Sequence, residues 1–254
     1  MDATDRRRFL RRIAGAAGAL LLGGCDRLSQ QPQARAVLAS AERLTAAAQR
    51  LLTPRAALAR EFTEADISPV FKPNGSTDPA EPAYRALAAD GFRDYRLAFG
   101  GLVRRPYSLS LDELRALPSR TQITRHDCVE GWSAIGKWKG VPLGGLLDRA
   151  ELLPAARYVV FRCADRLDAD GPAYYESIDF DDAYHAQTIL AYELNDAPLP
   201  VANGAPVRVR IERQLGYKMA KYVMAIDVVA SFADIEGGNG GYWEDQGYEW
   251  YAGI

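Results

Sequence analysis

The sequence has few of the side chains from which proteins build haem sites and metal clusters. Its 254 residues include three cysteines and two histidines, with no Cys-x-x-Cys-His motif and no group of closely spaced cysteines. Covalent haem attachment and cysteine-bound iron–sulfur clusters are therefore excluded, and electrons for any redox reaction must come from another molecule. Phosphate-binding glycine loops are also missing, since Gly23-Gly24 and Gly144-Gly145 fit neither the Walker nor the dinucleotide-binding pattern.

Clustered positive charge is also lacking after the N-terminal segment. The formal net charge is -2, and the first 24 residues contain five arginines against Asp2 and Asp5, so the rest of the chain is more acidic than the whole. That remaining part has no dense run of Lys and Arg. Nucleic-acid binding and a polybasic membrane surface are excluded, because counterion release requires clustered cations.

The N-terminal segment has the features of an export signal in the expected order. Arginines at positions 6–8 precede Phe9-Leu10, as in a twin-arginine signal, and an apolar run over residues 13–22 follows. This run is too short to span a bilayer, which takes about 20 apolar residues. The residues that follow, Leu22-Gly23-Gly24-Cys25, resemble a lipoprotein lipobox, and Asp26 resembles an inner-membrane retention signal. We expect residues 1–25 to direct Tat export to the periplasm, where an acylated Cys25 anchors the protein to the inner membrane.

Residues 26–66 are predicted to form a helical stalk or linker. Their apolar residues recur at spacings of 4, 3, 4 and 3, which places them on one helical stripe: Val37, Ala41, Leu44, Ala48 and Leu51. Thr53-Pro54 ends this helix, and residues 67–254 form the main domain.

Short extended segments separated by Gly, Pro, Asn and Asp predominate in the main domain. Helices are expected at 110–117, with Ser110 as N-cap, and at 143–150. Strands do not alternate regularly with long helices, so the pattern predicts a β-rich α+β domain with short irregular helices rather than a doubly wound parallel sheet. The expected strands are 95–103, 121–125, 158–163, 188–194, 207–211 and 222–229.

Cys128 lies in the most unusual stretch of the chain, Thr124-Arg125-His126-Asp127-Cys128-Val129-Glu130-Gly131-Trp132-Ser133. In an oxidising compartment it could form a disulfide with Cys163. The flanking Arg125 and His126 favour a thiolate, the form that binds a metal or attacks carbon, and a Cys128/His185 pair would suit a thiol enzyme. A zinc site built from these cysteines and histidines lacks the close ligand spacing typical of structural zinc.

Four blocks carry a resemblance to a known family. The most specific joins 126–132 to Lys137-Trp138-Lys139-Gly140-Val141-Pro142-Leu143, and the others are 191–200, 203–208 with 216–221, and 68–75. These blocks resemble the sulfite-oxidase-like molybdopterin oxidoreductases, in particular the bacterial branch related to the periplasmic methionine sulfoxide reductase catalytic subunit. The first block is similar to the family's molybdenum-ligand cysteine block.

The resemblance implies a sulfite-oxidase-type fold, a molybdenum-molybdopterin cofactor (Mo-MPT) and Cys128 as the metal ligand. A soft thiolate is a suitable protein ligand for molybdenum held by a dithiolene. Arg125 is the predicted catalytic cation beside this block, and Arg208, Lys218 and Lys221 suit the cofactor's phosphate. The full set of expected cofactor contacts is Ser68, Phe71, Lys72, Asn74, Cys163, Asn203, Arg208, Lys218, Met219, Ala220 and Lys221.

The expected activity is oxygen-atom or electron transfer on a small-molecule substrate. A membrane cytochrome or a quinone-linked partner is expected to exchange the electrons. Two alternatives remain open: a catalytically silent lipoprotein of the same fold that binds a cofactor or partner, and the Cys128/His185 thiol enzyme.

The C-terminal segment 237–251 is rich in glycine and contains five aromatic residues. We expect it to be ordered and to lie across the domain surface, since aromatic side chains bury large areas. The alternative is that Trp243 or Trp250 forms a wall of the substrate site.

Overall fold

The computed structural model describes residues 31–254 and divides the chain into two compact units, Met1–Leu52 and Thr53–Ile254. The predicted export signal lies outside the described residues. The described part of the first unit is one helix, α2 (Pro32–Leu52), on which Leu44 and Leu51 are exposed. Within residues 31–254, no helix combines the length and the hydropathy needed to cross a membrane.

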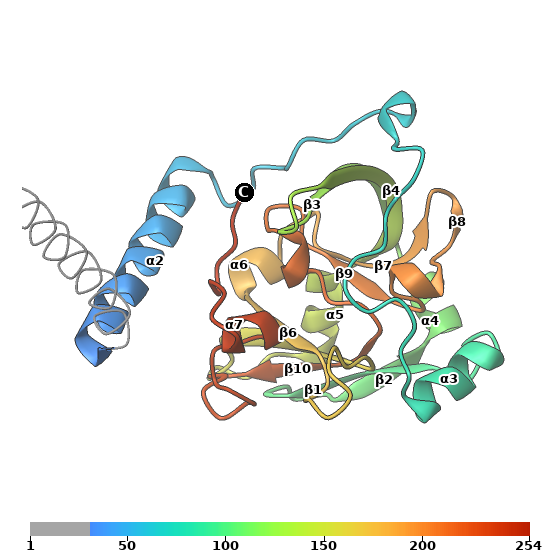
Figure 1. Cartoon of the computed structure of the whole chain (residues 1–254). Helices are drawn as coiled ribbons and strands as arrows, with labels where there is room; N and C mark the ends of the chain where they lie inside the picture. The colour runs from blue at the N-terminus through green and yellow to red at the C-terminus, as the bar shows by residue number, and fades with distance from the viewer. Residues whose placement is uncertain (1–30) are drawn as a thin grey trace, which may run out of the picture. The chain divides into compact units, whose positions relative to one another are not determined.

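The second unit contains a five-stranded mixed sheet in the order β2-β1-β10-β5-β6. Strand β1 pairs parallel with β10, and the other neighbours pair antiparallel. Figure 1 draws β1 and β10 below the strands of a second sheet. The strands are β1 (Arg96–Gly101), β2 (Tyr107–Ser110), β5 (Tyr158–Cys163), β6 (Tyr175–Asp179) and β10 (Val223–Val229).

The second sheet has the order β3-β4-β7-β8, with β9 also pairing to β7, and all of its pairs are antiparallel. The segment that precedes β1 in this unit adds to the edge of the sheet, because the Phe62 amide donates to the Ile123 carbonyl (2.8 Å). The strands are β3 (Arg120–Asp127), β4 (Ser133–Pro142), β7 (Ile189–Leu194), β8 (Ala197–Pro198) and β9 (Arg208–Arg210).

Short helices join the strands. Helix α4 (Leu111–Arg115) begins with a capping box, in which Ser110 Oγ accepts from the Glu113 amide (3.1 Å) and the Glu113 carboxylate accepts from the Ser110 amide (2.7 Å). The other short helices are α3 (Pro82–Ala89), α5 (Leu143–Ala150), α6 (Phe180–Ala183) and α7 (Tyr242–Asp245), with 3₁₀ turns η1 (Glu64–Asp66), η2 (Val201–Asn203) and η3 (Gly216–Lys218).

The structure confirms the predicted β-rich α+β class, the cap at Ser110 and the bounds of α5 and β5. The longest strand, β4, was missed because its glycines and lysines have low strand propensity. Gly140 is required there by close approach, since a Cβ at this position would lie 2.2 Å from the Leu190 carbonyl oxygen of β7.

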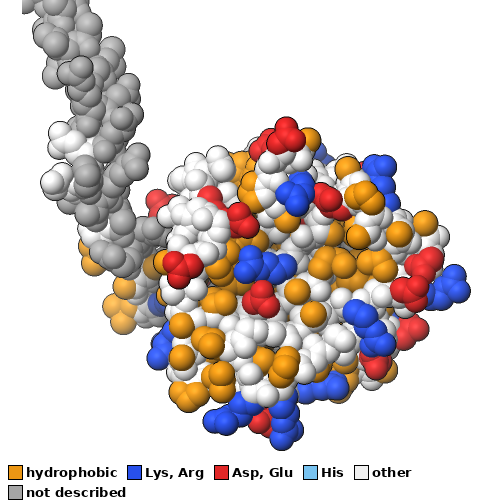
Figure 2. Space-filling view, turned by 90° about the horizontal axis from the view of Figure 1, so that it is seen from below, with side chains coloured by type: hydrophobic (Ala, Val, Ile, Leu, Met, Phe, Trp, Pro, Cys, Tyr) orange, Lys and Arg blue, Asp and Glu red, His pale blue; other side chains and the backbone are white. Residues whose placement is uncertain are grey.

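Two hydrophobic clusters stabilise the domain. The larger contains side chains from both sheets and from α5, among them Phe99, Leu147 and Leu190. The smaller surrounds Phe71 and Trp138, whose rings meet edge to face at 5.0 Å. On the face drawn in Figure 2, side chains of both charges are interspersed with hydrophobic ones.

Candidate active site

A cavity of about 120 Å³ is lined by Cys128 and by several segments that are far apart in the sequence. These are the loop 74–76, the turn 128–130, the loop after β5, residues 216–221 and the segment that contains α7. Val129 and Tyr248 both line the cavity and are 47% and 39% exposed, so the mouth is open and partly apolar.

A tight turn between β3 and β4 places Cys128 at this cavity. The Cys128 amide donates to the Trp132 carbonyl (2.9 Å), and the Gly131 amide donates to the Cys128 carbonyl (3.0 Å). Gly131 has φ +86°, a conformation that favours glycine. Burial raises the pKa of the Cys128 thiol, so the protein alone does not make it a thiolate at neutral pH.

The structure contradicts two of the alternative roles for Cys128. Both Cys128 and Cys163 are free thiols, and Cys163 is buried in the larger hydrophobic cluster, so the disulfide is absent. His185 lies in a separate hollow with Arg55 and Tyr184, where its Nε2 is 2.9 Å from the Ala57 carbonyl oxygen. The Cys128/His185 pair is therefore not formed. Residues 31–254 also contain no group of three His, Cys, Asp or Glu side chains that could hold a metal ion.

Arg125 is not placed at the cavity, contrary to the prediction. Successive side chains of a strand point to opposite faces, and the neighbouring His126 is fully buried on the inner face of β3. Arg125 therefore points outward, is 55% exposed and pairs with Asp127 at 2.9 Å. His126 provides no positive charge either, because burial and the nearby Arg210 hold its pKa well below the usual range.

Lys218 also differs from the prediction. It is fully buried and binds two carboxylates, Glu176 of β6 (2.5 Å) and Glu244 of α7. Burial and the neighbouring Glu244 raise the pKa of Glu176 well above its usual range, although Lys218 opposes this shift. The ammonium of Lys218 therefore ties the C-terminal segment to the core, which leaves it unavailable to a phosphate in the cavity.

Lys221, a predicted cofactor contact, lines the cavity. Its ammonium donates to the carbonyls of Asn74 (2.6 Å), Ser76 and Ala202 (3.2 Å), which connects the early loop to the turn at η2. Burial and the positive charge of Arg208 lower the pKa of Lys221 to about 7.

The remaining predicted contacts divide into cavity-lining and supporting residues. Asn74 and Met219 line the cavity, and Lys72 lies 3.8 Å from Glu130, which also lines it. Ser68 accepts a hydrogen bond from the Ile135 amide (2.9 Å). Phe71, Cys163, Asn203, Arg208 and Ala220 are buried and do not line the cavity.

Buried N–H donors without partners show what kind of group the site can hold. Arg208 donates through Nη1 to the Asn203 carbonyl (3.0 Å), but its Nε and Nη2 have no partner among residues 31–254. Trp138 Nε1 and His126 Nε2 are also buried without a partner in this part of the chain. These residues are neighbours: the Arg208 guanidinium lies 5.1 Å from the Trp138 ring, and Phe71 contacts both Trp138 and His126. A cluster of unpaired donors with two cations, Arg208 and Lys221, fits an anionic ligand such as a phosphate.

The C-terminal segment contributes to the cavity, which corrects the expectation that it lies only across the surface. Trp243 and Tyr248 line the cavity with their rings stacked at 5.1 Å. Trp250 instead donates to Ser177 Oγ (2.9 Å) and stacks on Phe232. The segment therefore both packs against the rest of the domain and lines the cavity.

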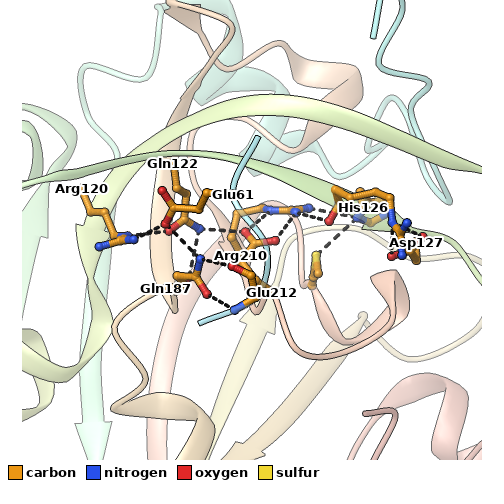
Figure 3. Close-up of polar contacts among 11 residues, drawn as sticks. Glu61, Arg120, Gln122, His126, Asp127, Gln187, Arg210 and Glu212 are labelled. Carbon is orange, nitrogen blue, oxygen red and sulfur yellow. Dashed lines mark hydrogen bonds and ion pairs between the residues drawn. The ribbon is translucent and has the colours of Figure 1, made fainter. Parts of the chain in front are cut away.

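Sequence reasoning missed several residues around the site, most clearly Asp165, Arg210 and Glu212. Asp165 lines the cavity with its Oδ1 unpartnered, and burial raises its pKa to about 6. Figure 3 shows Arg210 between Glu212 and His126. The signal was present in the sequence: Arg208, Arg210 and Glu212 alternate with apolar residues, which predicts one polar face in a buried strand.

The family model and the named relatives that match this chain indicate one family. Residues 85–234 match the family model described as an oxidoreductase molybdopterin-binding domain. An Azospira oryzae protein with the provisional name protein-methionine-sulfoxide reductase subunit YedZ1 is 39% identical over 100% of this chain and 89% of its own length. A Xanthomonas axonopodis protein named protein-methionine-sulfoxide reductase catalytic subunit MsrP is 33% identical over 89% of this chain and 70% of its own. The sulfane dehydrogenase SoxCD structure from Paracoccus pantotrophus has a TM-score of 0.49 and 22% identity, and covers 55% of this chain and 39% of its own.

Proposed function

This chain belongs to the family of oxidoreductases with a molybdopterin-binding domain, and we propose that it is an exported sulfoxide reductase in which the Cys128 thiolate binds molybdenum. Family membership makes it a molybdenum-dependent oxidoreductase with a molybdenum-molybdopterin cofactor. The identity of the metal ligand, the substrate and the location are our inferences.

The observation that carries the proposal is the position of Cys128. It is the only cysteine among the described residues that lines the cavity, and it occupies the block that resembles the family's ligand cysteine. Because burial raises the pKa of its thiol, a bound metal cation would provide the charge that stabilises the thiolate.

The residues around the cavity fit the anionic cofactor. Lys221, which lines the cavity, and Arg208, which is buried with two nitrogens that have no partner among residues 31–254, would hold the phosphate together with the Trp138 N–H group. When bound, the cofactor supplies the two-electron redox change and the acceptor for an oxygen atom.

The substrate side of the cavity suits a neutral, largely apolar molecule. Trp243, Tyr248 and Leu167 line it, and none of the arginines in the described part of the chain does. Methionine sulfoxide, the substrate class in the names of the relatives, has a compact polar S=O group on an apolar side chain, and sulfur packs well against aromatic rings. Reduction of a sulfoxide to a thioether and water consumes two electrons and two protons. Asp165 Oδ1 is unpartnered in the cavity, and a carboxyl with a pKa of about 6 can hold and release a proton near neutrality.

The electrons would come from a membrane cytochrome or a quinone-linked partner. The names of the relatives describe subunits, one of them a catalytic subunit, which supports a separate electron-donating subunit. We place the protein at the periplasmic face of the inner membrane on the basis of residues 1–26. Turnover of the purified protein with native membranes, but not alone, is the expected result.

The test is elemental and pterin analysis of the full chain and two cysteine variants. Wild type should contain molybdenum and pterin and reduce methionine sulfoxide with a reduced dye as electron donor. Cys128→Ser should retain most of the pterin and lose activity, whereas Cys163→Ser, the matched control in the core, should remain active. Full activity in Cys128→Ser would refute the proposed ligand. A loaded wild type whose molybdenum signal does not respond to sulfoxide would favour a catalytically silent binding protein.

A further inference from the structure

His126 is held in place by a buried chain of charged and polar groups from β3, from β9 and from the residues that follow β9. Arg210 Nη1 lies 3.0 Å from His126 Nδ1, and the same guanidinium forms a two-pronged pair with Glu212 through Nε (3.0 Å) and Nη2 (2.7 Å). Both side chains of this pair are fully buried. Figure 3 shows the continuation of the chain, in which Gln122 Nε2 donates to Glu212 Oε1 (2.8 Å).

This arrangement fixes where the imidazole carries its hydrogen. A guanidinium has only donors, so the contact between Arg210 and His126 is a hydrogen bond only if Nδ1 is the acceptor. Nδ1 therefore carries no hydrogen, and the ring has its single hydrogen on Nε2. Glu212 prevents the guanidinium from turning away, because a bidentate pair has a fixed planar geometry.

The Nε2–H group produced in this way has no partner among residues 31–254. The Cε1–Nε2 edge of the ring faces Gly216, a residue that lines the cavity: a Cβ on Gly216 would lie 2.4 Å from Nε2. His126 Nδ1 is also 3.3 Å from Sδ of the cavity-lining Met219, but a thioether is only a weak acceptor, so the charge-assisted bond from the Arg210 guanidinium decides which ring nitrogen carries the hydrogen. A fully buried N–H group without an acceptor is costly, which indicates that its acceptor belongs to a bound group.

We propose that the Arg210–Glu212 pair is a positioning device that holds His126 as a neutral imidazole with its hydrogen on Nε2, so that this N–H donates to the anionic cofactor beside Gly216. This inference rests on the proposed function for the identity of the acceptor, but the tautomer follows from the protein alone. His126 is then a cofactor-binding residue, and Arg210 and Glu212 act through it.

Nitrogen NMR of histidine tests the tautomer directly. The sequence contains two histidines, so ¹⁵N-histidine labelling of the full chain gives two ring systems, and a His185→Gln variant assigns them. Protonated and unprotonated ring nitrogens differ widely in ¹⁵N shift. The chain is prepared from a host that makes the cofactor and from one that cannot, with pterin and molybdenum measured in both.

The expected result is a single His126 tautomer with Nε2 protonated in both preparations, and an Nε2–H signal that shifts when the cofactor is present. Arg210→Met should give a mixture of tautomers and about tenfold faster loss of pterin on dilution, the effect of weakening one charge-assisted hydrogen bond. Arg210→Lys, which keeps a donor, should retain the wild-type tautomer. The control Arg213→Met removes a guanidinium that pairs with Asp182 and should leave His126 unchanged.

A protonated Nδ1 or a tautomer mixture in wild type would overturn the proposal without any variant having to fold. An Nε2–H signal that is identical with and without cofactor would overturn the assignment of the acceptor. Absence of pterin and molybdenum from wild type would instead refute the proposed function and the acceptor with it, and the cofactor-free spectrum would still decide the tautomer.

Discussion

Substitution of Lys218 by methionine tests whether this lysine anchors the C-terminal segment 237–251 to the core or binds the cofactor. In the native protein its ammonium lies between Glu176 and Glu244, and all three side chains are at most 1% exposed. Lys218→Met keeps the length of the side chain but leaves two carboxyl groups facing each other in a buried site. Breaking a buried ion pair by removing one partner costs about 3–5 kcal/mol.

For a domain of this size each kcal/mol shifts Tm by about 2–4 °C, so Tm should fall by roughly 10 °C. The loss of stability of Lys218→Met relative to wild type should also depend on pH. The pKa of Glu176 is raised in the folded protein, and loss of Lys218 raises it further, so the unfolded chain releases protons that the folded chain retains. Stability of the variant therefore falls as pH rises above the usual carboxyl pKa of about 4.3, and the difference from wild type should be larger at pH 8 than at pH 5.

The assay is denaturant and thermal unfolding of cofactor-free protein, because a bound cofactor would add to stability by mass action. Lys139→Met is the matched control. It removes a partly exposed lysine paired with Glu193 at 3.3 Å and should change stability by about 0.5 kcal/mol or less. The reasoning is refuted if Lys218→Met unfolds like the control, or if its deficit does not shrink at low pH. Loss of pterin without loss of stability would return Lys218 to the role of phosphate ligand.

Three further predictions follow from the cavity and its cations. Trp243→Ala should raise KM for methionine sulfoxide severalfold, because Trp243 lines the cavity. Trp250→Ala should lower Tm and leave KM unchanged, because Trp250 donates to Ser177 instead. Steady-state kinetics in which the two effects were reversed would contradict this prediction. Gly216→Ala should lower the free energy of unfolding by about 1–3 kcal/mol and reduce the molybdenum content, because the added Cβ would lie 2.3 Å from the His126 ring. The control Gly145→Ala in α5 adds a Cβ that meets no described atom within 4 Å, so it should not destabilise the protein. Equal unfolding curves for the two variants would argue against the packing described. In cofactor-free protein the pKa of Lys221 is lowered to about 7, so between pH 7 and about 10 the unfolded chain binds more protons than the folded chain. The stability of wild type relative to Lys221→Met should therefore rise with pH in that range. A stability difference between the two proteins that is the same at pH 6.5 and pH 9 would disprove this prediction.

The buried cations Arg208 and Lys221 explain why the cofactor and the fold support each other. Burial and Arg210 lower the pKa of Arg208 to about 9, and Arg208 in turn lowers the pKa of Lys221. The protein therefore has like charges and unpaired donors close together inside the domain. An anionic ligand provides the missing acceptors and relieves the repulsion, so cofactor loading should stabilise the native state.

Local sequence determined the parts of the protein that depend on near neighbours. The capping box at Ser110 and Glu113 requires only a spacing of three residues, and the apolar run of β5, with its adjacent valines, has a high local preference for a strand. The block around Cys128 was recognisable because its residues are consecutive, and the turn that places the thiol at the cavity closes within five residues, from Cys128 to Trp132.

The tertiary structure decided which cations are available to a ligand. Lys218 and Lys221 are three residues apart and look equivalent in sequence, yet one is neutralised by Glu176 and Glu244 while the other opens into the cavity. Arg125 points outward because its neighbour His126 points inward. Whether a charged side chain can bind a ligand depends on the partners it already has. The partners of Lys218 are 26 and 42 residues away in the sequence, so only the packing of β6 and α7 against η3 brings them to it.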